Sequence, residues 1–363
     1  MLLSMQRFMR MIHSKIIQAG SYEELAAIRD DWTKQIQQSR LAEHPLAWNE
    51  HLNEVHDSII RRTLFLSESK LLEKGEGFAP CSYAYILFGS GGRKEQTLWS
   101  DQDSGLVYAP AEEDKERAEH YFASFAEKVT EGLETAGYPP CDGKVISSNA
   151  FWRRTIGEWR QQLEQWTQNS DWEANRYLLI FADMRCVYGD SFLTESLRKF
   201  FYQLLNNRPS LLQGLVNNTL HRKVATGFFG QLIREKYGHE AGSVDVKYGT
   251  YIPLVNGVRL LALLQNSKET ATLARLNTLK SSQLLSPALA DELQDAFQLT
   301  LKHRSISTGF IAEGYYSTSG KVPPRMLTKS VRKEIKIAVK AGKQLQQQVE
   351  SVIKAFENGR ISV

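Results

Sequence analysis

The sequence has little of what marks secreted, membrane or nucleic-acid-binding proteins. Its 363 residues include three cysteines, an odd number at scattered positions, which excludes a disulfide framework and a C-x-x-C metal knuckle. No apolar run is long enough to cross a bilayer, and basic residues interrupt the apolar side chains of residues 1–20, so a signal peptide is not indicated. The net charge of +4 is too small to indicate nucleic acid or a membrane surface as a partner. We therefore expect a cytoplasmic protein.

The composition is that of a folded protein with more than one domain. Hydrophobic residues make up 42% and charged residues 24%, which is enough apolar material for a core. The length suits about two or three domains. The pattern along the chain predicts an α+β fold with a helical region at residues 1–80, a small mixed sheet with helices at residues 81–205, and a helical bundle at residues 206–363.

Apolar periodicity and the positions of glycine and proline predict the individual elements. The expected helices cover residues 21–41, 46–75, 112–137, 152–166, 258–266, 290–304 and 329–359. The other expected elements are strands at residues 83–88, 103–109 and 143–147, a strand or helix at residues 175–190, and an exposed loop at residues 312–327. Ser21 and Glu24 form the pattern of a capping box at the start of the first of these helices.

The stretch "ILFGSGGRKEQTLWSDQDSGLVY" at residues 86–108 is the most distinctive in the chain. It is not a Walker A loop, because no Gly-Lys-Ser/Thr follows the first glycine. It is not a Rossmann fingerprint, because Lys94 stands where the third glycine belongs. What remains is a buried strand, a turn at Gly89 and Ser90, a short helix, and a second strand that begins with two alternating aspartates.

Asp101 and Asp103 are two residues apart, so on a strand their side chains project from the same face. Two carboxylates this close repel each other, and each raises the pKa of the other. A divalent cation between them removes that cost, and hard oxygen ligands suit Mg²⁺, which completes its shell with waters and substrate phosphates. The turn offers backbone N–H groups and a hydroxyl to a phosphate, and Arg93 adds a fork of donors. Together these parts favour metal-dependent transfer of a phosphoryl or nucleotidyl group.

The same stretch resembles a known group of enzymes. "FGSGGRKEQTLWSDQD" resembles the nucleotidyltransferase signature of the DNA polymerase β superfamily, in which glycine and serine precede an Asp-x-Asp pair. More closely, G-S-x-G-R-x-E-Q followed by D-Q-D looks like the nucleotidyltransferase domain of bacterial signalling proteins that often carry CBS pairs. It is also similar to the N-terminal part of the uridylyltransferases that modify PII signal proteins. Residues 141–166 and 181–190 resemble later blocks of that domain, and residues 244–264 resemble the helical domain that follows it.

The resemblance implies a role for each matching residue. Asp101 and Asp103 are implied to ligate Mg²⁺ or Mn²⁺ and to act in catalysis. The implied nucleotide-binding residues are Gly89, Ser90, Gly92, Arg93 and Lys247. Arg93 can equally brace the turn through Glu95, and a structural role for Lys247 is as well supported as contact with phosphate. A hydroxyl on a partner would then attack the nucleoside triphosphate, take the nucleotidyl group and release pyrophosphate.

The third carboxylate that this superfamily uses lacks a clear counterpart in the sequence. The resemblance places it two residues before a glycine, where this chain has Cys141. Asp142 is adjacent but would face the other way on a strand, so it serves as the candidate third catalytic acid only through a local shift. The alternatives are an acid elsewhere, such as Asp183, or no third acid at all. The last alternative would leave nucleotide binding without catalysis.

Several further residues are interpreted as structural. A solvated helix face is expected to carry His44, His51, His56 and Asp57. A stripe at seven-residue spacing that faces the core is expected for Trp152, Trp159 and Trp166. Arg185 and Asp190 are expected to brace the fold. The basic residues near the start of the last helix are expected on a solvated face that could dock an acidic partner.

Two functions from different classes fit these residues. The first is a Mg²⁺-dependent nucleotidyltransferase that moves NMP from an NTP to a hydroxyl on a signalling protein. The second is a catalytically degenerate regulatory protein that binds a nucleotide, which the missing acid favours. A transferase acting on a small molecule or an RNA end is a third interpretation, and the modest charge argues against RNA. The expected partners are a nucleoside triphosphate and an acceptor protein, with neither a membrane nor a nucleic acid.

Overall fold

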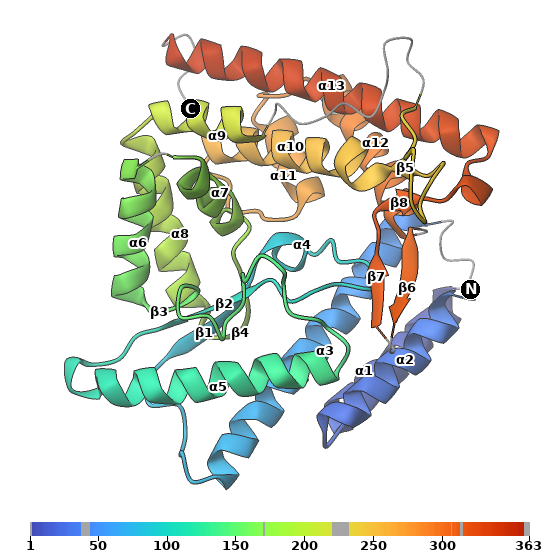
Figure 1. The fold of residues 1–363 in the computed structure, drawn as a ribbon. Helices are drawn as coiled ribbons and strands as arrows, with labels where there is room; N and C mark the ends of the chain where they lie inside the picture. The colour runs from blue at the N-terminus through green and yellow to red at the C-terminus, as the bar shows by residue number, and fades with distance from the viewer. Residues whose placement is uncertain are drawn as a thin grey trace. The chain divides into compact units, whose positions relative to one another are not determined.

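The computed structural model describes residues 2–37, 44–169, 171–219, 232–305, 307–312 and 315–358. Helices dominate it and a small mixed sheet accompanies them, so the predicted α+β class is confirmed (Figure 1). The chain divides into two compact units, and the predicted helical region of residues 1–80 belongs to the same unit as the sheet. The first unit consists of Met1–Gln162, Asp183–Leu197 and Phe310–Tyr315, and the second of Leu163–Ala182, Arg198–Gly309 and Tyr316–Val363.

The first unit begins with three helices and contains a fourth long helix after the first two strands. These helices are α1 (Leu2–Gln18), α2 (Tyr22–Gln37), α3 (Pro45–Glu73) and α5 (Lys115–Thr135). Pro45 suits the first turn of α3, where no backbone donor is needed. At the start of α2, the N–H of Glu24 donates to the Ser21 hydroxyl at 3.2 Å, and the Glu24 carboxylate accepts from the N–H of Gly20 at 2.7 Å. The two predicted capping residues therefore do cap this helix.

The sheet of the first unit has the strand order β3-β2-β1-β4. Its strands are β1 (Tyr83–Leu87), β2 (Ser104–Tyr108), β3 (Arg153–Thr155) and β4 (Arg185–Gly189). β1 is antiparallel to β2 and β4, whereas β2 and β3 run parallel. Every residue of β1 and β2 is buried, which explains their continuous apolar runs. Leu87 lies opposite Ser104, so the glycine turn that follows β1 meets the aspartates that precede β2.

The strand predicted at residues 143–147 is wrong, and the third strand is β3 instead. The chain turns before this segment, because the N–H of Lys144 donates to the Cys141 carbonyl at 2.9 Å. Lys144 also has a positive φ of 55°, a left-handed conformation that interrupts an extended ladder. The segment still contacts the start of β2 through a hydrogen bond from the N–H of Ser104 to the Val145 carbonyl at 3.0 Å.

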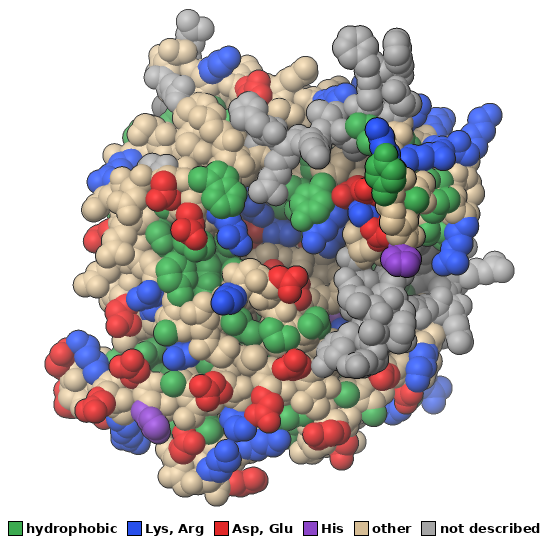
Figure 2. All heavy atoms as spheres, in the orientation of Figure 1, with side chains coloured by type: hydrophobic (Ala, Val, Ile, Leu, Met, Phe, Trp, Pro, Cys, Tyr) green, Lys and Arg blue, Asp and Glu red, His purple; other side chains and the backbone are tan. Residues whose placement is uncertain are grey.

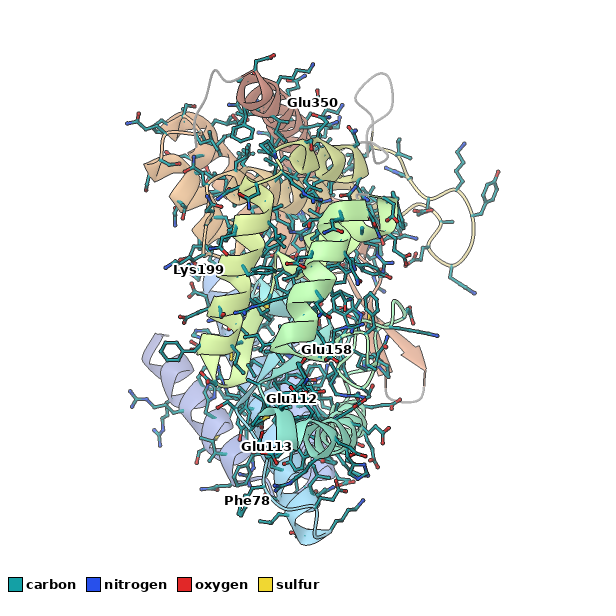
Figure 3. The ribbon with its side chains drawn as sticks, turned by 90° about the vertical axis from the view of Figure 1, so that its left-hand side faces the viewer. Phe78, Glu112, Glu113, Glu158, Lys199 and Glu350 are labelled. Carbon is teal, nitrogen blue, oxygen red and sulfur yellow. The ribbon has the colours of Figure 1, made fainter. Side chains whose placement is uncertain are left out.

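Four further elements connect the strands and helices of the sheet region. They are α4 (Gly89–Gly92), η2 (Glu112–Asp114), α6 (Ile156–Asn169) and α8 (Ser191–Asn206). At the start of α6, Glu158, which Figure 3 labels, accepts hydrogen bonds from the N–H and hydroxyl of Thr155 at 2.8 and 2.9 Å. The Thr155 hydroxyl in turn accepts from the N–H of Glu158 at 3.2 Å, which completes a reciprocal cap. The three predicted stripe residues are all buried: Trp152, Trp159 and Trp166.

The second unit is built mainly from helices. They are α7 (Trp172–Phe181), α9 (Ser210–Thr219), α10 (Ile252–Leu264), α11 (Thr272–Ser281), α12 (Pro287–Ser305) and α13 (Lys329–Glu357). α10 is buried almost all round, as its nearly unbroken apolar sequence requires. Lys and Arg side chains gather over one end of α13 (Figure 2). Among the described residues, no helix combines the length and the hydropathy needed to cross a bilayer.

The exposed loop predicted at residues 312–327 is wrong for most of its length. The short elements of this part are β5 (Val244–Asp245), η3 (Lys247–Tyr251), β6 (Thr308–Ala312), β7 (Tyr315–Thr318), β8 (Lys321–Val322) and η4 (Pro324–Met326). β6 pairs with β7, and β8 pairs with β5. Val322 and Leu327 are buried in a cluster with Val244 and Ile335. Polar and turn residues dominate this segment, so its pattern did not predict that Val322 and Leu327 are buried.

Candidate nucleotide and metal site

The turn after β1 is the four-residue helix α4, and it lies close to the aspartate segment. Phe88, just before it, donates its N–H to the Asp103 carbonyl at 2.9 Å. Gly89 has a positive φ of 50°, and a Cβ there would collide with the Asp103 carboxylate. A Cβ on Gly92 would collide with the carbonyl of Asp183. Glycine at both positions therefore allows the turn to approach Asp103 on one side and Asp183 on the other.

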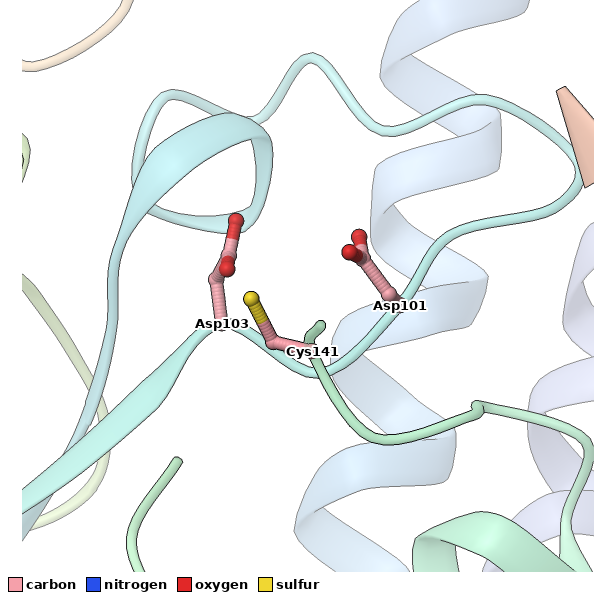
Figure 4. Close-up of side chains that lie close together, drawn as sticks. All are labelled: Asp101, Asp103 and Cys141. Atoms are coloured by element: carbon pink, nitrogen blue, oxygen red, sulfur yellow. The ribbon is translucent and has the colours of Figure 1, made fainter. Parts of the chain in front are cut away.

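Asp101, Asp103 and Cys141 bring two carboxylates and a thiol together (Figure 4). One ligand atom from each of the three side chains lies within 4.8 Å of the others. Asp101 is exposed, whereas Asp103 and Cys141 are partly buried. Both aspartates precede β2, and between them Gln102 forms a parallel bridge with Pro140. This bridge carries the next residue, Cys141, to the two carboxylates.

The thiol of Cys141 keeps its proton at neutral pH. Burial raises its pKa most, and the charge of Asp103 together with a hydrogen bond to that carboxylate raises it further, to about 12. Asp101 makes a smaller contribution of the same sign. The negative charge of the cluster therefore comes from the two carboxylates.

A small cavity adjoins the two aspartates, and Asp101, Asp103, Gln96 and Gln102 all line it. The two glutamines are only 3% and 4% exposed. The side-chain nitrogen of Gln102 donates to two backbone carbonyls, at 3.1 and 2.8 Å, which identifies the other terminal atom as the amide oxygen. That oxygen and the Oε1 of Gln96 have no hydrogen-bond partner in the part of the chain that the structure describes. Two buried acceptors therefore need a donor or a cation.

Arg93 is buried and held by two carboxylates. Its Nε donates to Glu95 at 2.9 Å, and another guanidinium nitrogen donates to Asp183. Arg93 is 5% exposed and Asp183 1%. This geometry supports the bracing role of Arg93 through Glu95. Asp183, the alternative third acid, lies in this ion pair and not in the carboxylate–thiol cluster.

Arg185 fixes α4 to α3. Its guanidinium donates two bonds to Asp57, at 2.8 and 2.9 Å, and two to the Gly91 carbonyl, at 2.8 and 3.3 Å. Arg185 thus braces the fold, as expected. The solvated face predicted for His56 and Asp57 is wrong, because both side chains are buried. Their hydrogen-bond partners lie far away in the sequence, so the local pattern did not reveal them.

His56 is fully buried next to Asp57. Its ring nitrogens form hydrogen bonds with the Tyr138 hydroxyl at 2.7 Å and the Thr97 carbonyl at 2.8 Å. Burial, with a smaller contribution from the charge of Arg29, lowers the pKa of the imidazole to about 3. The imidazole is therefore neutral at physiological pH and acts as a structural hydrogen-bonding group.

The other residues predicted to act in the site have different surroundings. Ser90 lies in α4, and its hydroxyl is 3.4 Å from that of Ser100, which directly precedes the first aspartate. Asp142 has an exposed side chain and is not part of the metal-ligand group found among the described residues. Lys247 begins η3 in the second unit, where its amine lies 5.7 Å from the centre of the Tyr248 ring.

Sequence reasoning missed Gln96 and Gln102. A signal for Gln102 was present, because alternation in "DQD" puts the middle residue on the face opposite the aspartates and therefore toward the interior. No comparable signal marked Gln96, which reaches the cavity through the path of the loop after α4.

A glycine turn held against two clustered aspartates in an α+β unit has the parts of a nucleotidyltransferase-like protein. Residues 31–173 match a family model described as "Putative nucleotidyltransferase DUF294". Residues 209–353 match one described as "Putative nucleotidyltransferase substrate binding domain". No curated protein matches the chain. The chain is thus nucleotidyltransferase-like in residues 31–173, and residues 209–353 are similar to a domain that accompanies such transferases.

The side chains of the cluster suit a divalent cation in part. The carboxylates of Asp101 and Asp103 are the hard oxygen ligands that Mg²⁺ prefers. The two unpartnered amide oxygens in the adjoining cavity suit a water donor. The thiol of Cys141, in contrast, is not a ligand of the all-oxygen shell of Mg²⁺.

Proposed function

We propose that this chain is a Mg²⁺-dependent nucleotidyltransferase that moves a nucleoside monophosphate from a nucleoside triphosphate to a hydroxyl group. The acceptor that we propose is a signalling protein, as for the PII uridylyltransferases that the sequence resembles. The observation that carries the proposal is the cluster of the Asp101 and Asp103 carboxylates beside a turn whose geometry requires Gly89. The match to a nucleotidyltransferase family model supports it independently.

In this proposal Asp101 and Asp103 hold Mg²⁺ or Mn²⁺. The cation, when bound, offsets the charge of the triphosphate and of the pyrophosphate that leaves. The first N–H groups of a helix have no partner within that helix, so α4 offers those of Gly89 and Ser90 to a phosphate. Gly92 lets the turn pack against the backbone beneath it, and Arg93 keeps the turn rigid while adding positive charge.

Two further residues have proposed roles toward the substrates. Lys247 contributes a positive charge for a phosphate group. Asp142 accepts the proton of the attacking hydroxyl, since its carboxylate is exposed and can be reached by an acceptor. The thiol of Cys141 is unsuited to that task, because its raised pKa keeps it protonated at neutral pH.

The second candidate function is a regulatory protein that binds a nucleotide without transferring it. The observation that favours it is the thiol of Cys141, which lies beside the two aspartates where the resemblance expects a third carboxylate. In that case the cation and the turn would still hold a triphosphate, and the bound nucleotide would act as a signal.

The deciding experiment incubates the purified full chain with Mg²⁺, host lysate and each nucleoside triphosphate in turn, radiolabelled at the α-phosphate. The D101N/D103N double variant runs alongside, and Glu113→Gln, an exposed acid outside the site, is the matched control. Label on a lysate protein with the wild type and with the control variant, but not with the double variant, would establish transfer and identify both base and acceptor.

The alternative function has its own signature in the same experiment. No label with any nucleoside triphosphate, together with Mg²⁺-dependent nucleotide binding that the double variant loses, would reject the enzyme and retain the regulatory protein. Label that dialysis or denaturing electrophoresis separates from macromolecules would instead indicate a small-molecule acceptor.

A further inference from the structure

We propose that Asp101, Asp103 and Cys141 form a mixed carboxylate–thiolate site that binds a borderline divalent cation, such as Co²⁺ or Zn²⁺, more tightly than Mg²⁺. Cys141 is a direct ligand in this site. The proposal rests on the proposed function in taking the two aspartates as metal ligands. It goes further in assigning a ligand role to the thiol and a metal preference to the site.

The first argument is the position of the thiol. The Cys141 sulfur and one oxygen of each aspartate lie within 4.8 Å of one another, close enough for the three to ligate a shared cation (Figure 4). The parallel bridge between Gln102 and Pro140 fixes the strand-like segment that carries the thiol. The backbone therefore holds Cys141 next to the aspartate segment.

The second argument comes from the cavity that adjoins the two aspartates. Gln96 and Gln102 line the cavity there, and each is more than nine-tenths buried with an amide oxygen that lacks a hydrogen-bond partner within the described residues. Water in this cavity is a donor that satisfies such oxygens. A cation at the cluster removes the mutual repulsion of the carboxylates, which share this polar cavity with the two amides.

The metal preference follows from the ligand chemistry. Sulfur ligands favour softer cations, whereas carboxylates and water favour Mg²⁺, Ca²⁺ and Mn²⁺. When the cation binds, Cys141 gives its proton to solvent, and the sulfur lone pair forms the bond to the metal. Mg²⁺ gains little from that bond, so it is held by Asp101 and Asp103 alone. A borderline cation gains a third protein ligand and therefore competes with Mg²⁺ for the same place.

The test titrates the metal-free full chain with Co²⁺ and records the thiolate-to-metal absorption band, with Mg²⁺ binding measured by calorimetry. The variants are Cys141→Ser and Cys141→Asp. The matched controls are Cys81→Ser and Cys186→Ser, which change the other two thiols, both also partly buried. Circular dichroism checks that each variant folds, and the two replacements at Cys141 guard against failure of either one.

We expect the band in the wild type and in both controls, and its loss in both Cys141 variants. Cys141→Ser should weaken Co²⁺ binding by about tenfold or more while leaving Mg²⁺ binding unchanged. Cys141→Asp should shift the preference toward Mg²⁺. A band that persists in Cys141→Ser, or Co²⁺ binding that this variant leaves unchanged, would overturn the proposal. Nucleotidyl transfer is scored separately, so an inactive wild type that shows the band rejects only the enzymatic function.

Discussion

The first unit uses aspartate side chains in two different ways. Asp57 and Asp183 are buried, and each carboxylate is bonded to an arginine that joins distant parts of the chain. Asp101 and Asp103 lie only a few residues from this buried network, yet they face each other and a protonated thiol. The first pair, through its arginines, holds the glycine turn in place. The turn packs against the segment that carries the second pair.

The physical reason for the difference is solvent. A buried carboxylate without a counter-ion is very costly, so Asp57 and Asp183 can be retained only with their arginines. Asp101 is exposed, so water screens its repulsion from Asp103 and the cluster can persist until a cation binds. Burial with a paired charge thus indicates a structural role, and clustered like charges at a solvent-accessible edge indicate a ligand site.

The largest expected effect concerns the buried acids. Asp183→Ala leaves the Arg93 guanidinium buried with one carboxylate fewer and should lower the free energy of unfolding by about 3–5 kcal/mol. Urea unfolding followed by circular dichroism measures it. The control is Glu113→Ala, whose side chain is exposed in η2 (Figure 3) and should change stability by less than about 0.5 kcal/mol. Equal effects of the two changes would remove the distinction between the buried and the exposed acids.

The next effect concerns His56, the neutral base within the buried network. Its pKa is lowered to about 3 in the fold, whereas the unfolded chain titrates near its ordinary value of 6.5. The unfolded state therefore binds the proton first, and the stability contributed by the neutral ring is present above pH 6.5 and lost as the pH falls toward 3. The expected loss is about 2 kcal/mol between about pH 7 and about pH 5.

Unfolding by urea at each pH measures this loss. The variant His56→Gln should flatten the dependence, and the control His120→Gln, which changes an exposed ring, should leave it as in the wild type. An unchanged slope in His56→Gln would show that another group is responsible for the acid sensitivity.

The sequence revealed much of this architecture because its strongest signals are local. The apolar runs of β1 and β2, the glycine turn between them and the long amphipathic helices can each be recognised from neighbouring residues. The closeness of Asp101 and Asp103 follows from their short spacing, and the resemblance places Cys141 where a third carboxylate is expected. The predicted third strand failed because Lys144 adopts a left-handed conformation that no apolar pattern reports.

The errors of greater consequence concern long-range pairs. His56 and Asp57 lie on a helix with mixed polar and apolar residues, and their pattern resembles a solvated face. Their burial depends on Tyr138 and Arg185, which are 82 and 128 positions away in the chain. The same is true of Gln96, whose role depends on a cavity formed by several elements. Periodicity within one element cannot report partners that come from another.

A smaller effect should follow from Gly89→Ala in the turn between the two groups of acids. Its positive φ is unfavourable for alanine by about 1–2 kcal/mol, and the added methyl group would displace the Asp103 carboxylate. We expect a moderate loss of stability together with weaker Co²⁺ binding. The control is Gly157→Ala in the exposed first turn of α6, which should be neutral or stabilising by up to about 1 kcal/mol. Full retention of Co²⁺ binding in Gly89→Ala would contradict the close approach of the turn to the cluster.

The smallest effect on stability, and the sharpest separation of the two groups of acids, is expected for Asp101→Asn. The side chain is exposed and one of two neighbouring negative charges is removed, so in the presence of a chelator the free energy of unfolding should change by less than about 0.5 kcal/mol.

The wild type and Asp101→Asn should differ in stability once a cation is supplied. A ligand that binds only the folded state raises stability in proportion to the logarithm of its concentration above the dissociation constant. Co²⁺ or Mg²⁺ should therefore stabilise the wild type progressively and Asp101→Asn much less, which unfolding curves at a series of cation concentrations will measure. A loss of several kcal/mol in the chelated variant would place Asp101 with the buried, structural acids. A cation response equal to that of the wild type would show that Asp101 is not a ligand.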